Sequence, residues 1–551
     1  MSAAIHAATF ESVEFDPFAG ASVERVVPTS EAQREVWLAD KLGQEASLAF
    51  NESVNLRLRG TLDVAGLRSA LDALVSRHDT LRATVGPDGT ELIIGADAVV
   101  DLPVFDLRAQ SADEQQATLD RAAVAAVETP FDIERGPLFR AALYRLSEDH
   151  HLLLMTAHHI ACDGWSWAVI TEDLGLLYAE RIGVAPSPDE PAHYADYVAW
   201  EAAEAASPEM REHEAFWLRR FAGSSLPVLD LPTDRPRSPV RSFRSRRIDH
   251  TLDAALVADV RKLGAKAGAS VFATLFSGFA ATLHRLTGQD DLVIGVPAAG
   301  QSASGMTSLV GHCVNLLPIR TAVDPAQPFD AYVAQAGSAM LDAFDHQTLT
   351  YGTLLTKLPV QRDASRLPLV SVMFNVDQEV SGSPGAFPDL SVELSANARR
   401  FENFELFINA APVNGGFRLE CQYNTDLFDA ATIQRWLGAY EMLLRSATRD
   451  ARQAVGQLDW LAPAERSALK ALQPAATPLA ATELMHSAIA RQCAATPQRV
   501  ALRFGDTQLS YLDLDQRSNR LARALRARGI GRGERVGLCV ARSADMVVSL
   551  L

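Results

Sequence analysis

Hydrophobic and polar positions along the chain follow two periods, one typical of strands and one typical of helices. Short apolar runs predict strands at 53–58, 141–146, 152–157, 292–296 and 370–376. Apolar positions spaced three and four residues apart predict helices at 165–179, 212–221, 254–265, 271–286 and 431–447. Because helices alternate with strands along most of the chain, we expect an α/β fold.

Two helices near the N-terminus carry further signals. Ser30 is followed three residues later by Gln33, a capping-box pattern that predicts a helix starting at Ser30. A second helix, which runs toward Arg77, is predicted by the apolar stripe of Leu67, Leu71, Leu74 and Val75.

The composition describes a globular protein that can bury large cores. The 551 residues are 48% hydrophobic and 22% charged, and at roughly 150 residues per domain this length predicts three or four compact units. The formal net charge of −17 argues against a nucleic-acid binder, because contact with phosphates needs a concentrated basic surface.

Cysteine usage and the N-terminus bear on the compartment. The cysteines show neither paired nor Cys-x-x-Cys spacing, which is typical of a reducing cytoplasm; they are Cys162, Cys313, Cys421, Cys493 and Cys539. The chain does not open with a basic region followed by an apolar stretch, and no run approaches 18 apolar residues. We therefore expect a cytoplasmic protein that is neither exported nor inserted into a membrane.

The stretch His158-His159-Ile160-Ala161-Cys162-Asp163-Gly164 is the strongest candidate for chemistry, because it follows a predicted strand where the backbone turns. Adjacent residues on a strand point to opposite faces, so only one imidazole can reach a given substrate. The other histidine and Asp163 are expected to shape the turn, and Gly164 to permit a backbone conformation or a close approach that a Cβ would forbid. No metal is expected, because neither His-Glu-x-x-His nor an equivalent spacing occurs.

Five other segments accompany this motif in a fixed order. They are SEAQREVW at 30–37, RHDTLR at 77–82, YADYVAW at 194–200, VGHCVNLLPIR at 310–320 and RDASRLPL at 362–369. Together with His-His-x-x-x-Asp-Gly, they resemble the ordered motifs of condensation domains of non-ribosomal peptide synthetases, within the chloramphenicol-acetyltransferase-like superfamily. The resemblance runs from about Val27 to about Leu461.

The resemblance implies two α/β lobes of the chloramphenicol-acetyltransferase type that meet in a V, at 23–201 and 202–461. Residues 1–22 are interpreted as an N-terminal tail or docking segment, and 462–480 as a linker. Residues 481–551 resemble the truncated start of an adenylation domain, from the segment 509–514 and a helix at 518–528. The chain stops at Leu551, in what reads as a helix, before any phosphate-binding loop, so no ATP site is expected in this segment.

By resemblance, the reaction joins two carrier-bound thioesters through an amide bond. Each substrate arrives on a phosphopantetheine arm of a carrier protein, and the condensation domain itself binds no cofactor. Because Met1 leaves no room for a preceding domain, we expect the donor carrier on a separate polypeptide and the acceptor carrier on the same synthetase. A basic run is interpreted as a solvated connector, with contact to the phosphate of a carrier arm as the alternative; it holds Arg235, Arg237, Arg241, Arg244, Arg246 and Arg247.

The motif residues receive distinct roles. His159 is assigned as the residue that positions the acceptor amine or accepts its proton, and the two roles stay open. Backbone N–H groups around Gly164 are candidates for stabilising charge on the thioester oxygen. Asp163 is interpreted as structural and tied to an arginine, with Arg320 as the first choice and Arg82 as the second.

Other residues of the motifs are expected to line the substrate channel or to pack. Trp165, Asn315 and Ser365 are assigned to the channel. Cys162 is interpreted as a small packing residue, and His312 and Cys313 as local packing.

Several other functions are weighed against condensation. A coenzyme A-dependent acyltransferase shares the His-x-x-x-Asp-Gly core but is disfavoured by the doubled histidine and the adenylation start. Epimerization domains also carry the doubled histidine, but they normally follow a carrier and do not precede an adenylation domain. Cyclization domains replace the motif with paired aspartates, which this motif lacks. A catalytically silent recruitment module of the same fold is the alternative from a different class. The segment 311–318 resembles modules fed by a polyketide synthase, so the donor is a polyketide acyl chain or, alternatively, a peptidyl chain.

Overall fold

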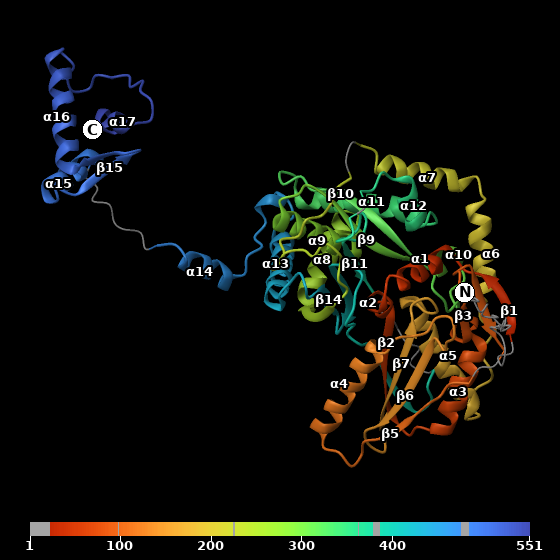
Figure 1. The fold of residues 1–551 in the computed structure, drawn as a ribbon. Helices are drawn as coiled ribbons and strands as arrows, with labels where there is room; N and C mark the ends of the chain where they lie inside the picture. The colour runs from red at the N-terminus through yellow and green to blue at the C-terminus, as the bar shows by residue number, and fades with distance from the viewer. Residues whose placement is uncertain (1–22, 97–98, 224–225, 362, 378–385, 475–483) are drawn as a thin grey trace, which may run out of the picture. The chain divides into compact units, whose positions relative to one another are not determined.

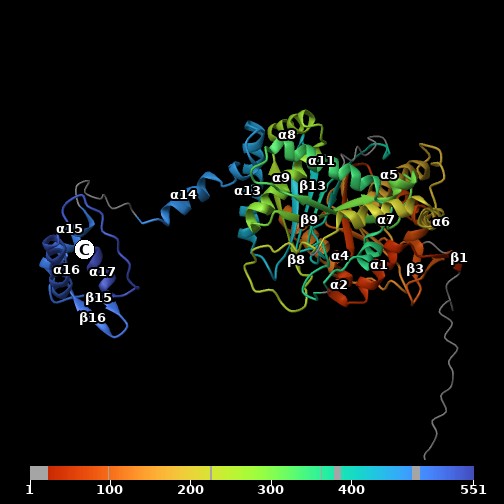
Figure 2. The same ribbon diagram turned by 90° about the horizontal axis from the view of Figure 1, so that it is seen from above.

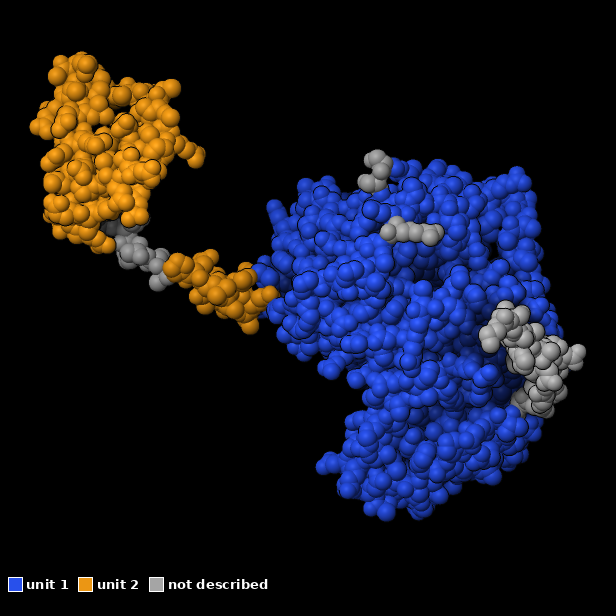
Figure 3. Space-filling view, in the orientation of Figure 1, with its two compact units in different colours: residues 1–463 blue, residues 464–551 orange. Residues whose placement is uncertain are grey.

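The computed structural model describes residues 23–96, 99–223, 226–361, 363–377, 386–474 and 484–551. The chain divides into two compact units, residues 1–463 and 464–551 (Figure 3). The predicted tail or docking segment at 1–22 lies outside the described residues, as do Arg362 and part of the linker predicted at 462–480.

The first lobe of unit 1 is a five-stranded sheet with helices on both faces (Figure 1). Helices α3 and α5 pack on one face and α4 on the other. The strand order is β12-β2-β7-β6-β5, and all neighbours are antiparallel except β5 and β6. The bounds are β2 (Asn51–Gly60), α3 (Val64–Arg77), β5 (Val104–Asp106), α4 (Ala112–Glu128), β6 (Phe139–Arg145), β7 (His150–His158), α5 (Gly164–Arg181) and β12 (Leu390–Ala396).

The second lobe is a six-stranded sheet in the order β10-β9-β11-β13-β14-β8, with parallel pairing at β9–β11 and β11–β13. Helices α8, α9, α11 and α13 share one apolar core with it, and Figure 2 shows α8, α9 and α11 together over the sheet. The bounds are β8 (Ser245–Leu252), α8 (Ala254–Lys266), α9 (Val271–Thr287), β9 (Asp291–Ala299), β10 (Val314–Ala322), α11 (Phe329–Asp345), β11 (Val372–Val376), β13 (Leu406–Val413), β14 (Gly416–Asn424) and α13 (Ala430–Arg449).

The chain crosses between the lobes more than once. Helices α6 (Tyr194–Ala205) and α7 (Glu209–Arg220) lead from the first sheet to the second. The chain later returns as β12, which pairs with β2 in antiparallel register from Leu390 opposite Gly60 to Ala396 opposite Val54. The lobe boundary predicted between 201 and 202 falls inside α6, and the first lobe takes its edge strand from the later half of the chain.

Shorter elements complete the fold. In unit 1 they are β1 (Val23–Pro28), α1 (Glu31–Asp40), α2 (Gln44–Leu48), β3 (Ala83–Val85), β4 (Glu91–Gly95), α10 (Gly300–Ser304) and α12 (Tyr351–Lys357), with β1, β4 and β3 forming a small sheet. Around and within unit 2 they are α14 (Pro463–Ala471), α15 (Met485–Ala495), β15 (Val500–Phe504), β16 (Thr507–Ser510), α16 (Tyr511–Ala527) and α17 (Ala544–Leu550).

The periodicities predicted from the sequence are confirmed. Every predicted strand and helix overlaps an observed element of the same type. The capping box also forms, because the Ser30 hydroxyl accepts from the N–H of Gln33 (3.1 Å) while the Gln33 side chain accepts from the N–H of Ser30 (3.2 Å). The α/β fold with two lobes is therefore the observed one.

Among the described residues, no single helix has the length and apolar character needed to cross a membrane. The successive helices α8 and α9 satisfy the test only when taken together, and they bend by 101° at their junction.

Candidate active site

The doubled histidine lies where β7 of the first lobe ends. The N–H of His159 donates to the carbonyl of Phe50 (2.7 Å), which extends the contact between β7 and β2 by one residue. A short turn follows, and α5 begins at Gly164 with Asp163 as its N-cap. Strand pairing on one side and a capped helix on the other therefore fix the backbone of the motif.

The two imidazoles enter different surroundings. His158 is fully buried, its ring centroid about 6 Å from those of Phe50 (6.1 Å) and Phe131 (6.0 Å), and its Nδ1 accepts from the N–H of Ile160 (3.2 Å). Burial, helped by the neighbouring His159, lowers the pKa of His158 to about 3. His159 keeps 17% of its side chain exposed and turns toward the second lobe. The prediction that the histidines point apart is confirmed.

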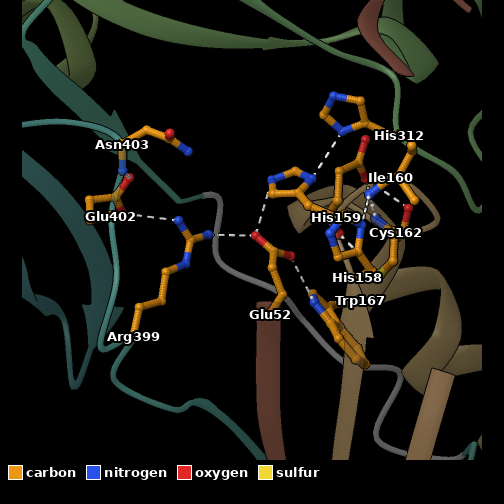
Figure 4. Close-up of polar contacts among 12 residues, drawn as sticks. Glu52, His158, His159, Ile160, Cys162, Trp167, His312, Arg399, Glu402 and Asn403 are labelled. Carbon is orange, nitrogen blue, oxygen red and sulfur yellow. Dashed lines mark hydrogen bonds and ion pairs between the residues drawn. The ribbon is translucent and has the colours of Figure 1, made fainter. Parts of the chain in front are cut away.

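His159 lies between an acid and a second histidine (Figure 4). Its Nε2 is 3.2 Å from Oε1 of Glu52, on β2. Its Nδ1 is 2.9 Å from Nδ1 of His312, in the turn before β10, and the two rings meet edge to face at 4.7 Å. Glu52 also accepts from Nε1 of Trp167 (3.0 Å) and from Arg399 (2.5 Å).

The charge states of Glu52 and His312 indicate which nitrogen of His159 carries its proton. Burial acts to raise the pKa of Glu52, but His159, Arg399 and Trp167 outweigh it and hold that pKa below its usual value. Burial, with the two motif histidines, lowers the pKa of His312 well below its usual value. Because an ionised carboxylate only accepts, Nε2 of His159 carries the proton. In neutral His159 the lone pair is on Nδ1, which accepts from Nδ1–H of a neutral His312.

Asp163 is fully buried and joins three segments. It accepts from the N–H (2.9 Å) and hydroxyl (2.7 Å) of Ser166, from Nε2 of Gln301 (3.0 Å) and from the N–H of Cys313 (3.0 Å). Burial raises the pKa of Asp163, and these hydrogen bonds oppose that shift. The carboxylate thus fastens the start of α5 to α10 and to the turn before β10.

The prediction that Asp163 pairs with an arginine was wrong. Arg320 forms a two-pronged ion pair with Asp291 on the neighbouring strand (3.0 and 2.7 Å). Arg82 pairs with Asp79 (2.9 Å) and with Glu24 (2.7 Å). Neutral donors already satisfy Asp163 within the core, and both guanidinium groups find acids close to them in sequence or register.

Gly164 departs in part from its expected role. It takes an ordinary helical conformation as the first residue of α5, so no special backbone geometry requires glycine there. A Cβ on Gly164 would meet no atom of the chain within 4 Å. The open space beside it agrees with room for a substrate, and the close approach stays a prediction.

The three residues assigned to the channel are not gathered at one point. The indole of Trp165 donates to the carbonyl of Thr307 (3.0 Å), which ties α5 to the second lobe. Asn315 borders a cavity of about 260 Å³, although its amide holds the loop before α12 by donating to the carbonyls of Gln347 (2.7 Å) and Leu349 (2.9 Å). Ser365 belongs to the loop before β11, where its N–H donates to Asp363 (2.8 Å).

Sequence reasoning missed the groups that hold His159. The prediction of His312 as local packing was wrong, because its ring contacts His159. Glu52 lies one residue before the strand predicted at 53–58, and its position opposite Ala157 in the β2–β7 register brings it beside the motif. The one available signal for His312 was that its segment departs from the commoner pattern of the family.

The basic run is largely neutralised by carboxylates. Arg237 forms a two-pronged pair with Glu405 (2.6 and 3.0 Å), and Arg244 pairs with Glu45 (3.1 Å). The run ends inside β8 and is therefore only in part a connector. Its arginines serve chiefly to join segments of unit 1.

The two lobes and the histidine site define the class of protein. The condensation domain model matches residues 23–470, and the chain belongs to this family, whose members are acyltransferases that form amide bonds. The AMP-binding enzyme model matches residues 489–551. The chain therefore carries a condensation domain followed by a short AMP-binding segment.

Known proteins agree with this assignment. A linear gramicidin synthase from Brevibacillus parabrevis is 32% identical over 97% of this chain, which spans 11% of that relative. A solved four-domain nonribosomal peptide synthetase bound to AMP and glycine shares the fold, with a TM-score of 0.72 at 21% identity over 93% of this chain and 40% of its own. The X-domain from teicoplanin biosynthesis has a TM-score of 0.68 at 27% identity, over 80% of this chain and 99% of its own.

Acid should destabilise the folded chain through His158. The folded pKa is about 3, whereas an unfolded histidine titrates near ~6.5. The unfolded chain therefore binds one more proton between these values, and the free energy of unfolding falls by about 1.4 kcal/mol per pH unit as the pH decreases. Urea unfolding of wild type and of His158→Gln between pH 6 and 4.5 should show a shallower pH dependence in the variant. The exposed His486→Gln should keep the wild-type slope, and an unchanged slope in His158→Gln would contradict the assignment.

Asp163→Asn should weaken the junction between the lobes. The new amide would place an NH₂ group against donors that now point at a carboxylate oxygen. Leaving such buried donors unsatisfied is expected to lower the free energy of unfolding by about 2–3 kcal/mol, measured by urea unfolding. Asp196→Asn, at an exposed position of α6, should stay within about 0.5 kcal/mol of wild type. Equal effects of the two substitutions would argue against this role.

Proposed function

We propose that this chain joins a donor acyl thioester to the amine of an acceptor aminoacyl thioester. The amine nitrogen attacks the thioester carbon, a C–N bond forms and the C–S bond breaks. The proton lost by the amine ends on the departing thiolate. Both substrates are bound through phosphopantetheine arms of carrier proteins.

The observation that carries this proposal is the setting of His159. It is partly exposed at the contact between the lobes, with Nε2 held by Glu52 and Nδ1 by His312. An unperturbed α-amine has a pKa near ~8, so part of it is neutral near pH 7 without help from a base. The amine therefore does not need to be deprotonated in advance. His159 positions it and accepts its proton only as the bond forms.

The lone pair of His159 defines the route of the proton. In the neutral tautomer that lone pair is on Nδ1, facing His312. A proton from the amine reaches it directly, in place of His312, or through His312, which takes the proton on Nε2 and passes its Nδ1 proton to His159. Either route uses His159 as the final acceptor.

The first turn of α5 offers donors for the developing charge. The N–H groups of Gly164 and Trp165 have no acceptor within the described part of the chain. Both belong to the N-terminus of a helix, where the backbone dipoles favour negative charge. We assign them to the thioester oxygen, which becomes an oxyanion when the amine attacks.

The partners follow from the two thioesters. We propose one carrier protein for the donor and one for the acceptor, and a polyketide acyl chain as the donor, with a peptidyl chain as the alternative. The segment Gly311–Pro318 motivates the polyketide assignment.

A second candidate is recruitment of another protein without catalysis. The likeness to the X-domain, which was also solved as a complex with OxyB, supports this candidate. The intact His159, Asp163 and Gly164 favour amide formation over it. A coenzyme A-dependent acyltransferase is less favoured, since an AMP-binding segment follows the condensation domain.

Amide formation should depend on His159. With donor and acceptor carriers loaded synthetically, His159→Ala is expected to form amide about a hundred to ten thousand times more slowly than wild type, measured by mass spectrometry of the acceptor carrier. His486→Ala, in unit 2, should retain the wild-type rate. A wild-type rate in His159→Ala would refute the role of this histidine, and no amide from intact protein would favour recruitment.

A further inference from the structure

An imidazole and a guanidinium share one carboxylate oxygen beside the motif. Oε1 of Glu52 accepts from Nη2 of Arg399 at 2.5 Å and lies 3.2 Å from Nε2 of His159. The other oxygen accepts from Trp167 at 3.0 Å. Arg399 reaches back through Nη1 to Glu402 at 3.0 Å (Figure 4). The imidazole and the guanidinium therefore compete for the same negative charge.

This group of charges is sheltered from water. The side chains of Glu52 and Glu402 are 9% and 2% exposed, and that of Arg399 is 22% exposed. A carboxylate in such a place needs a positive partner or a proton. Arginine keeps its charge at every relevant pH, so Glu52 has a permanent counterion that does not depend on His159.

The charges that face His159 come from several elements. Glu52 is on β2, and Arg399 and Glu402 are on the segment between β12 and β13, which joins the two sheets. Asp377, after β11, is near enough to Glu52 for that charge to help raise its pKa, although burial is the main cause. The remaining titratable neighbours are His158 on β7 and His312 before β10, and burial keeps both neutral.

A lone carboxylate at this position would change His159. An ionised acid within about 4–6 Å of an imidazole favours the imidazolium, by roughly one to three pH units. An imidazolium has no lone pair and cannot accept a proton from an amine. A carboxylate whose charge is already matched can still accept the Nε2–H hydrogen bond and fix the tautomer.

We propose that Arg399 is a positioning residue, which neutralises Glu52 so that Glu52 fixes the tautomer of His159 without converting it to the imidazolium. This inference rests on the proposed role of His159 as acceptor of the amine proton. It adds that the segment crossing between the lobes supplies the positive charge that balances Glu52. Arg399 acts through Glu52 and touches neither substrate nor the reacting atoms.

The proposal requires opposite effects from the two partners. Arg399→Met should leave Glu52 without its permanent counterion, so His159 should protonate at a pH about one unit higher than in wild type. Glu52→Gln keeps the shape of the side chain but removes its negative charge and leaves Arg399 paired with Glu402 alone, so His159 should protonate at a lower pH. The double variant should fall between the two single variants.

The measurement follows protonation without any substrate. The chain is labelled with ¹³C at Cε1 of histidine, the His159 signal is assigned by its loss in His159→Gln, and its shift is followed with pH by NMR. Opposite displacements support the proposal. Displacements in the same direction, or none in either variant, overturn it.

Two further variants test whether the charge of Arg399 causes the displacement. Arg399→Lys retains the positive charge and should keep the wild-type midpoint even if Arg399→Met folds poorly; a displaced midpoint in a folded Arg399→Lys chain would count against charge as the cause. Arg400→Met is the matched control, because Arg400 pairs with the distant Glu128 (3.2 Å) and not with Glu52. It should leave the His159 signal unchanged.

Activity separates this inference from the function on which it rests. Amide formation by Arg399→Met should fall several-fold at neutral pH and recover at alkaline pH, following the NMR midpoint. Midpoints that move as expected without any change in the rate profile would refute the role of His159 while the charge relation holds. If amide formation depends on His159 but the NMR midpoint of His159 does not move in the variants, the role of Arg399 is refuted.

Discussion

The site depends on the hydrogen bonds that the carboxylate of Asp163 accepts. This carboxylate is fully buried and takes its hydrogen bonds from neutral groups of both lobes: Ser166 on the helix that it caps, Gln301, and the backbone of Cys313. Losing any of these donors would leave a buried charge poorly solvated, which is costly. The three segments are thus held together, and the turn that carries His159 is kept against the turn that carries His312.

A second junction between the lobes uses full charges. Strand β12 returns from the later half of the chain to pair with β2, and the segment that follows it brings Arg399 to Glu52. The first junction fixes where the imidazole of His159 lies, and the second sets the charge around it. Because both require the lobes to be assembled, the setting of His159 is a property of the complete condensation domain and not of its motif alone.

The sequence predicted the secondary structure well and the site only in part. Apolar periods act over a few residues, so helices such as α9 and strands such as β7 were placed correctly. The separation of His158 from His159 also followed from strand geometry. The prediction that Asp163 pairs with an arginine was wrong, and Glu52 and Arg399 were missed. Local sequence pattern does not reveal which distant groups a buried carboxylate will contact.

What the sequence determined by itself was the order of elements, the six motifs and the family that they identify, since caps, periods and spacings are local. Tertiary structure alone decided which groups hold His159: Arg399 is 347 residues from Glu52, and His312 is 153 residues from His159. Hydrogen bonds and ion pairs act only within about 3–4 Å. These contacts therefore form only after the two sheets and the crossing strand have packed, and the local sequence cannot specify them.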